Sequence, residues 1–105
     1  MNKAQLIYAL KSGKYNQANY QLVVVKSLIQ GDKMEKTKEE IVKDLTLKNP
    51  TVKAKYFQSG SCPVWKVLTK KDILLKSENG FKLNLTRATQ KTKDDIIDLC
   101  DLLIQ

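Results

Sequence analysis

Apolar residues recur three or four positions apart in several segments of the chain, which is the spacing that predicts α-helices with one buried face. Residues 2–11 carry this pattern and are followed by Gly13, so we predict a short first helix that serves packing. Residues 19–30 form a broader apolar face that opens with Asn19, a favourable N-cap. Three consecutive valines inside this segment would also suit a strand. The length and the helix-end signals favour a buried helix.

Capping signals predict further helices. Thr37 and Glu40 form a capping box, in which the threonine oxygen accepts a hydrogen bond from the N3 amide and the glutamate reaches back to the cap. A helix to about Leu47 should follow. Pro63 suits the first turn of a helix because its φ is fixed and it has no N–H, so we predict a helix over residues 63–71.

Two apolar runs flank Glu78-Asn79-Gly80, a pattern that predicts a β-hairpin with its turn at residues 78–80. A two-residue loop would mix charged side chains into the apolar face. We therefore predict a three-residue loop with Gly80 in the left-handed conformation. That register pairs the following residues: Leu75 with Leu83, Ile73 with Leu85, and Lys76 with Lys82. Like charges opposed across two strands repel, so an anion beside the lysine pair would stabilise the hairpin.

Thr92 predicts the start of a last helix over residues 92–104. This helix is apolar around much of its circumference, which is more than one small domain would bury. We expect it to form an interface with a second copy of the chain or with a further domain.

The formal net charge of +8 is concentrated in one part of the chain. Residues 48–87 contain nine lysines and arginines against two acids, whereas residues 88–105 contain two against four. A basic excess on the segment with the helix and hairpin is typical of a nucleic-acid-binding surface. The alternative is that the lysines only solubilise the protein, but this does not by itself explain the asymmetry.

Several classes of function are disfavoured by composition. The chain has no histidine, which excludes His-ligated zinc and His-based acid–base catalysis. Its two cysteines, Cys62 and Cys100, have no metal-binding or redox spacing. We therefore predict a binding domain rather than an enzyme, with no metal and no cofactor. No apolar run is long enough to span a membrane and no signal peptide is evident, so we expect a cytoplasmic protein with no membrane partner.

The helix over residues 63–71 carries the candidate contacts to DNA bases. A buried stripe of valines and leucine would turn the opposite side of this helix toward a ligand, and the wing at 78–80 would lie along the adjacent backbone. Candidates for contacting base edges are Lys66, Thr69, Trp65 and Cys62. Candidates for binding phosphates are Lys53, Lys55, Ser61, Lys70, Lys76 and Lys82.

Aromatic residues near this helix leave two interpretations open. Trp65 is either a lid on the core or a platform for a modified or flipped base, with Tyr56 and Phe57 closing the pocket. The long connection over residues 48–60 is either a basic flap beside the helix or an insertion whose aromatic residues cover the core.

The order of elements, helix, helix, basic helix and two-stranded wing, is that of a winged helix-turn-helix domain. We expect a mainly α fold with a small β-hairpin, an extra N-terminal helix and a C-terminal helix. The chain resembles the N-terminal winged-helix modules that precede nuclease domains in prokaryotic restriction endonucleases. The resemblance covers about residues 19–104 and is carried by these motifs: Asn19-Tyr20-Gln21, Lys38-Glu39-Glu40-Ile41, Asn49-Pro50, Tyr56-Phe57, Pro63-Val64-Trp65-Lys66-Val67-Leu68, Ile73 and Phe81-Lys82-Leu83-Asn84-Leu85.

The resemblance implies a double-stranded DNA-binding domain that recruits a separate C-terminal nuclease domain, and it implies that the chain is a fragment. Some proteins of this group are modification-dependent, so recognition of a modified cytosine is a further expectation. The core of the domain would be residues 19–85, preceded by a helix and connection at 1–18 and followed by a linker and helix at 86–105. A protein-interaction module, or a homodimer through residues 92–104, is the alternative.

Overall fold

The computed structural model describes residues 1–16, 18–59 and 62–104. The protein is mainly helical and contains a small three-stranded antiparallel sheet. The elements are α1 (Lys3–Ser12), α2 (Tyr20–Ile29), the 3-10 turn η1 (Asp32–Met34), β1 (Glu35–Thr37), α3 (Lys38–Lys48), α4 (Ala54–Gln58), α5 (Val64–Lys70), β2 (Leu74–Lys76), β3 (Gly80–Leu83) and α6 (Gln90–Leu103).

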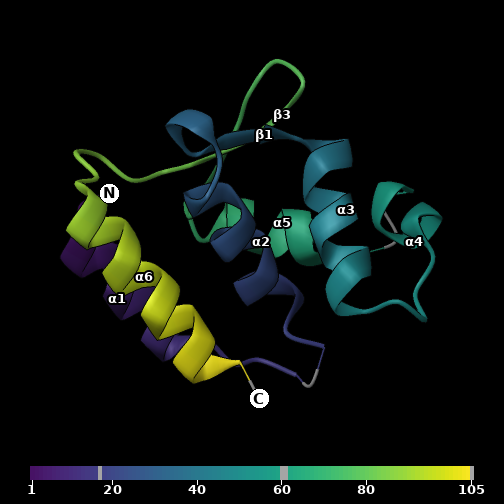
Figure 1. Cartoon of the computed structure of the whole chain (residues 1–105), viewed down its shortest axis with the longest axis horizontal. Coiled ribbons are helices and arrows are strands. Elements are labelled where there is room, and N and C mark those ends of the chain that lie inside the picture. The colour runs from purple at the N-terminus through teal and green to yellow at the C-terminus, as the bar shows by residue number, and fades with distance from the viewer. Residues whose placement is uncertain (17, 60–61, 105) are drawn as a thin grey trace.

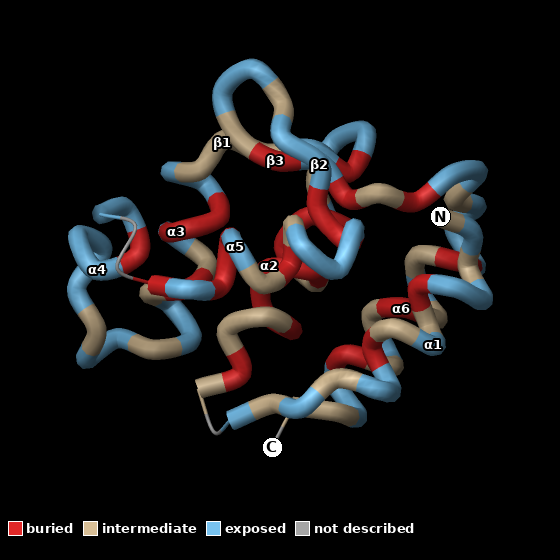
Figure 2. The backbone as a smooth tube through the Cα atoms, turned by 180° about the vertical axis from the view of Figure 1, so that it is seen from behind, coloured by how far each residue is buried: buried red, intermediate tan, exposed pale blue. Residues whose placement is uncertain are grey.

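The helix α2 occupies the centre of the molecule, and the other elements surround it (Figure 1). The helices α1 and α6 lie side by side at one edge, α4 lies at the opposite edge, and the sheet lies above α2 and α3 in this view. Buried residues concentrate on the inner sides of these elements, as Figure 2 shows. The predicted burial of the valine-rich segment is confirmed, because all three consecutive valines of α2 are at most 8% exposed.

The predicted helices α1, α2, α3 and α5 are confirmed with small changes at their ends. The capping box of α3 is present: Thr37 Oγ1 accepts from the Glu40 amide at 3.2 Å, and Glu40 Oε1 accepts from the Thr37 amide at 2.9 Å. Asn19 is the N-cap of α2 but holds a left-handed conformation and makes no side-chain capping bond. Pro63 is the N-cap of α5, so the helix begins at Val64, one residue later than predicted.

The predicted start of the last helix was wrong. The helix α6 begins at Gln90, with Thr89 as its N-cap, and Thr92 lies buried inside it. Thr89 and Thr92 could each cap this helix. Thr89 is the observed N-cap, and its hydroxyl accepts a hydrogen bond from the Thr92 amide at 3.2 Å. The helix α6 also exposes less apolar surface than predicted, because α2 and α1 cover part of it. Among the described residues, Leu102 is its one strongly exposed apolar side chain.

The strand β1 was not predicted, and it makes the sheet three-stranded in the order β1-β3-β2. It pairs with β3 through Thr37 opposite Gly80 and Glu35 opposite Lys82. The two strands approach closely: a Cβ on Gly80 would lie 2.1 Å from the carbonyl oxygen of Lys36. Glycine is therefore required at this position for close packing rather than for a left-handed turn.

The predicted hairpin register was wrong. The structure pairs Leu74 with Leu83, Leu75 with Lys82, and Lys76 with Phe81. This register buries both Leu74 and Leu83, which the predicted one did not pair. It also separates the lysines that were expected to repel, because Lys82 lies between Leu75 and the acidic Glu35 of β1.

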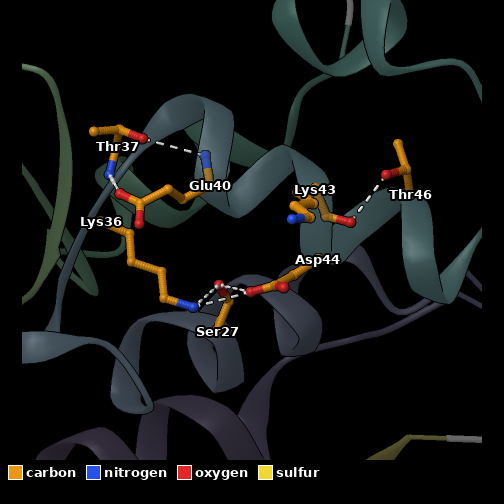
Figure 3. Close-up of polar contacts among 7 residues, drawn as sticks. All are labelled: Ser27, Lys36, Thr37, Glu40, Lys43, Asp44 and Thr46. Atoms are coloured by element: carbon orange, nitrogen blue, oxygen red, sulfur yellow. Dashed lines mark hydrogen bonds and ion pairs between the residues drawn. The ribbon is translucent and has the colours of Figure 1, made fainter.

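A partly buried polar network fixes β1 against the helices (Figure 3). Lys36 Nζ lies 3.0 Å from Asp44 Oδ2 of α3 and 3.3 Å from Ser27 Oγ of α2, and Ser27 donates to the same carboxylate at 2.5 Å. Three elements are thus joined by one ion pair and its hydrogen bonds. Since partly buried groups are less screened by water than surface pairs, this network helps hold the sheet in place.

No helix among the described residues is long and apolar enough to cross a membrane.

Candidate nucleic-acid interface

A groove of about 570 Å³ lies between α5 and the β2–β3 hairpin. We call it the α5–hairpin groove. It is lined by Lys38 at the start of α3, by residues in and just before α5, and by two hairpin residues; the full set is Lys38, Cys62, Pro63, Trp65, Lys66, Thr69, Lys70, Lys76 and Phe81. All four residues that the sequence proposed for contacts to DNA bases therefore line this groove.

Local structure explains how the basic residues reach this groove. Lys66 and Lys70 are one helical turn apart on α5, and both are exposed. Lys76 arrives from the hairpin because the observed register places it opposite Phe81, whose side chain packs toward α5. The same register sends Lys82 to the other face of the sheet, beside Glu35.

The electrostatic character of the groove is uniformly positive. Four of the residues that line it are lysines, and none of its lining residues is an aspartate or glutamate. Within the described part of the chain, Lys66, Lys70 and Lys76 form no ion pair. Lysines without acidic partners keep their charge available for an anion.

Lys38 was not among the residues predicted to bind a ligand, although it lies directly after the helix cap. Its Nζ donates to the carbonyl oxygen of Gln58 at 3.3 Å and lies 5.5 Å from the centroid of the Trp65 ring. It reaches the groove because β1 brings the start of α3 against β3. Since β1 was missed in the sequence, the position of Lys38 was missed with it.

Thr69 lines the groove and is half-buried. Its hydroxyl donates to the carbonyl oxygen of Trp65 at 2.6 Å. The hydroxyl proton is therefore already used inside the protein, and Thr69 can offer a ligand its methyl group and the lone pairs of its oxygen. An apolar contact suits a methyl group in the major groove of DNA, such as that of thymine.

The structure corrects the predicted roles of Trp65 and Cys62. Trp65 is 8% exposed, stacks on Phe81 with ring centroids 5.0 Å apart and planes 3° apart, and donates from Nε1 to the Phe57 carbonyl at 2.9 Å. Its ring is occupied on one face and its only donor is satisfied, so Trp65 is a lid on the core. Cys62 is 2% exposed and is likewise too buried to contact a base edge.

The predicted base pocket of Tyr56, Phe57 and Trp65 is not formed. Phe57 is fully buried, and Tyr56 packs against it with ring centroids 5.4 Å apart. Both rings contact Tyr20 of α2, at 5.1 Å from Phe57 and 6.4 Å from Tyr56. The aromatic residues of α4 thus cover the core, which is the second of the two interpretations of this connection.

The phosphate candidates divide into distinct groups. Lys70 and Lys76 line the α5–hairpin groove. Lys82 lies on the opposite face of the sheet, and Lys53 and Lys55 are exposed at α4 but do not line the groove. Ser61 lies outside the described residues.

The remaining thiol and the acids suggest no reactive centre. Burial raises the pKa of the Cys100 thiol to about 12, so it stays protonated at neutral pH. Among the described residues, no group of three or more histidine, cysteine, aspartate or glutamate side chains could hold a metal ion.

Neither a protein-family model, nor a curated protein, nor a solved structure matches this chain significantly.

Proposed function

We propose that this chain binds double-stranded DNA, with α5 in the major groove and the β2–β3 hairpin beside it. The observation that carries the proposal is the convergence of four lysines, and no acid, on the α5–hairpin groove. Phosphate contacts supply most of the affinity of sequence-independent DNA binding, and lysine is a common donor to them. Lys66, which is exposed on α5, would reach base edges, while Lys38, Lys70 and Lys76 would bind phosphates.

The arrangement of elements supports a winged-helix assignment. The chain runs α2, β1, α3, α4, α5, β2, β3, with the short helix α4 inserted between α3 and α5, and β1 pairs with β3. In such a domain α5 is the recognition helix and the hairpin is the wing. Together with the motifs described above, this order supports a module that delivers DNA recognition to a nuclease carried elsewhere in a restriction-type protein.

Thr69 is the residue that would recognise a modified cytosine. The stack of Trp65 on Phe81 leaves no platform for a flipped base. The methyl group of a 5-methylcytosine lies in the major groove and can be contacted without flipping, by an apolar group such as the Thr69 methyl. The proposal therefore predicts discrimination by contact rather than by extrusion of the base.

Fluorescence anisotropy with a labelled random duplex, measured from 50 to 200 mM salt, tests the proposal. The three phosphate lysines of the α5–hairpin groove should contribute about −2.7 to the slope of log K against log salt, which is a loss of affinity of about 40-fold over that range. Lys76→Ala should make the slope less negative by about 0.9, and Lys66→Ala should weaken binding of preferred sequences by about 1 to 3 kcal/mol.

Lys91→Ala is the matched control for these variants. Its side chain is 81% exposed on α6, and it removes the same charge from a distant surface. If Lys66→Ala and Lys76→Ala change neither affinity nor slope relative to this control, the groove is not a DNA site.

A protein-interaction module is the second candidate, because two large apolar side chains are exposed on the paired helices α1 and α6. Tyr8 is 75% exposed and Leu102 is 80% exposed. Such a module would bind duplex with almost no salt dependence, and Leu102→Ser would weaken partner binding or self-association. Sedimentation of the Leu102→Ser variant against the wild-type protein distinguishes the two candidates.

A further inference from the structure

We infer that α5 has a second phosphate-binding site on its other flank, formed by Lys14, Gln21 and Lys71, so that each flank of the helix takes one strand of the duplex. This inference rests on the proposed function and specifies its ligand: a duplex rather than a single strand.

A second hollow, of about 370 Å³, lies between α5, the start of α2 and residues 14–16. We call it the α2–α5 hollow. Its lining residues are Lys14, Tyr15, Asn16, Asn19, Tyr20, Gln21, Pro63, Val64 and Val67. Pro63 also lines the α5–hairpin groove, so the two depressions meet at the start of α5.

Helical geometry places the two depressions on opposite sides of α5. Successive residues of an α-helix are turned by about 100°, so Lys66 and Lys70 lie within about 40° of each other and form the outermost line of α5. Trp65 and Thr69 fall on one side of this line and face the α5–hairpin groove. Val67 falls on the other side, in the α2–α5 hollow.

The diameter of α5 matches the width of the DNA groove that it would enter. An α-helix with its side chains is about 10–12 Å across. The major groove of B-DNA is about 12 Å wide and is bordered by one sugar-phosphate backbone on each side. A helix that enters it with Lys66 foremost therefore brings one backbone to the α5–hairpin groove and the other to the α2–α5 hollow.

The chemistry of the α2–α5 hollow suits a phosphate. Lys14 is exposed at its rim, and no aspartate or glutamate is among its lining residues. Lys71, directly after α5, donates from Nζ to Gln21 Oε1 at 3.3 Å. This contact uses the side-chain oxygen of Gln21 and one N–H of the Lys71 ammonium group. The amide N–H groups of Gln21 and the remaining N–H groups of Lys71 are left as donors for a ligand.

The arrangement predicts selectivity for duplex. A single strand would occupy the more basic α5–hairpin groove, which four lysines line, and would leave the α2–α5 hollow empty. A duplex fills both, because its two backbones border the groove that holds α5.

The double variant Lys14→Ala/Lys71→Ala tests this inference, with Lys91→Ala/Lys93→Ala on α6 as the control of equal charge. Binding of a labelled 20-base-pair duplex and of one of its strands is measured by anisotropy between 50 and 200 mM salt, after circular dichroism has shown that each variant is folded. We expect the slope of log K against log salt for the duplex to become less negative by about 1.8, with a change of less than about 0.4 for the single strand.

Other outcomes separate this inference from the function on which it rests. An unchanged duplex slope for Lys14→Ala/Lys71→Ala, with a reduced slope for Lys76→Ala, overturns the second site and leaves duplex binding by the first. Equal losses on duplex and single strand also overturn it, because the lysines would then act without distinguishing two backbones. A wild-type protein without salt-dependent duplex binding refutes both proposals.

Discussion

Replacing Gly80 by alanine should separate β1 from β3 and loosen the hairpin. The added Cβ would lie 2.1 Å from the Lys36 carbonyl oxygen and 2.6 Å from the Thr37 Cα, and both are backbone atoms that no side-chain rotation can move away. Ordinary van der Waals contact begins near 3.4 Å, so the two strands must separate or the backbone must bend.

The loss of stability can be estimated from the close contacts and the backbone hydrogen bonds that the separation disturbs. Overpacking a close contact costs about 1–3 kcal/mol, and stretching one or two backbone hydrogen bonds of the β1–β3 ladder adds about 0.5–1.5 kcal/mol each. We expect the free energy of unfolding to fall by at least about 2 kcal/mol. For a domain of this size that lowers Tm by about 8–16 °C.

Thermal unfolding followed by circular dichroism measures this effect, and Gly31→Ala is the matched control. A Cβ on Gly31 would lie 3.0 Å from the Glu35 carbonyl oxygen and 3.0 and 3.2 Å from two atoms of the Lys36 side chain, which is a much milder approach than the 2.1 Å at Gly80, so a smaller loss is expected. Equal Tm values for Gly80→Ala and the wild-type protein, within about 2 °C, would refute the close approach of the strands and with it the register of the sheet.

Three further predictions concern the groove and the caps. Thr69→Val keeps a methyl group and loses the internal hydroxyl bond, so it should bind methyl-bearing duplexes as the wild-type protein does, whereas Thr69→Ser should lose affinity for a 5-methylcytosine or thymine site relative to unmodified cytosine; anisotropy with paired duplexes measures both, and equal effects of the two variants would exclude a methyl contact. Glu78→Gln removes an exposed negative charge from the hairpin turn and should strengthen duplex binding by about twofold at low salt, since a unit charge about 10 Å from a phosphate in water repels it by about 0.4 kcal/mol; unchanged binding would place the turn away from DNA. The backbone amide of Thr37 and then its hydroxyl lower the pKa of Glu40 below its ordinary 4.5, so its contribution to stability is present above that value and is lost as the pH falls through the lowered pKa; Glu40→Gln should show a smaller fall in Tm between pH 6 and pH 3 than the wild-type protein, and identical pH profiles would contradict the capping role.

The helices could be predicted because their signals are local. Apolar spacing together with caps such as Thr37 and Pro63 depends on residues within one or two turns, and the structure places these helices within a residue or two of the prediction. The error at α6 is of the same local kind: two threonines offered equivalent caps, and the sequence contained no rule to choose between Thr89 and Thr92.

The sheet could not be predicted in the same way, because its determinants are distant in sequence. The strand β1 is three residues long and carries no apolar alternation, so it exists only through its pairing with β3. The hairpin register was predicted from turn preferences and from keeping charged side chains off the apolar face of its two strands. The contact between Gly80 and Lys36, more than forty positions apart, was not available to that argument and is part of what the observed register satisfies.

The candidate site was predicted in part for the same reason. Lys66, Thr69 and Lys70 follow from the helical spacing of α5, and Lys76 from its place in the hairpin. The exposure of an aromatic residue depends on what covers it, and the sequence did not show that Phe81 would stack on Trp65.

That stack also determines how the protein would respond to its ligand. Trp65 belongs to α5 and Phe81 to the hairpin, so the parallel rings join the two walls of the α5–hairpin groove through the core. The spacing between the walls is therefore set before any ligand arrives. If the protein binds DNA as proposed, a groove of fixed width would require the DNA to change shape instead. Sequences that bend or widen easily would then bind more tightly than stiff ones, even at positions where no base is contacted.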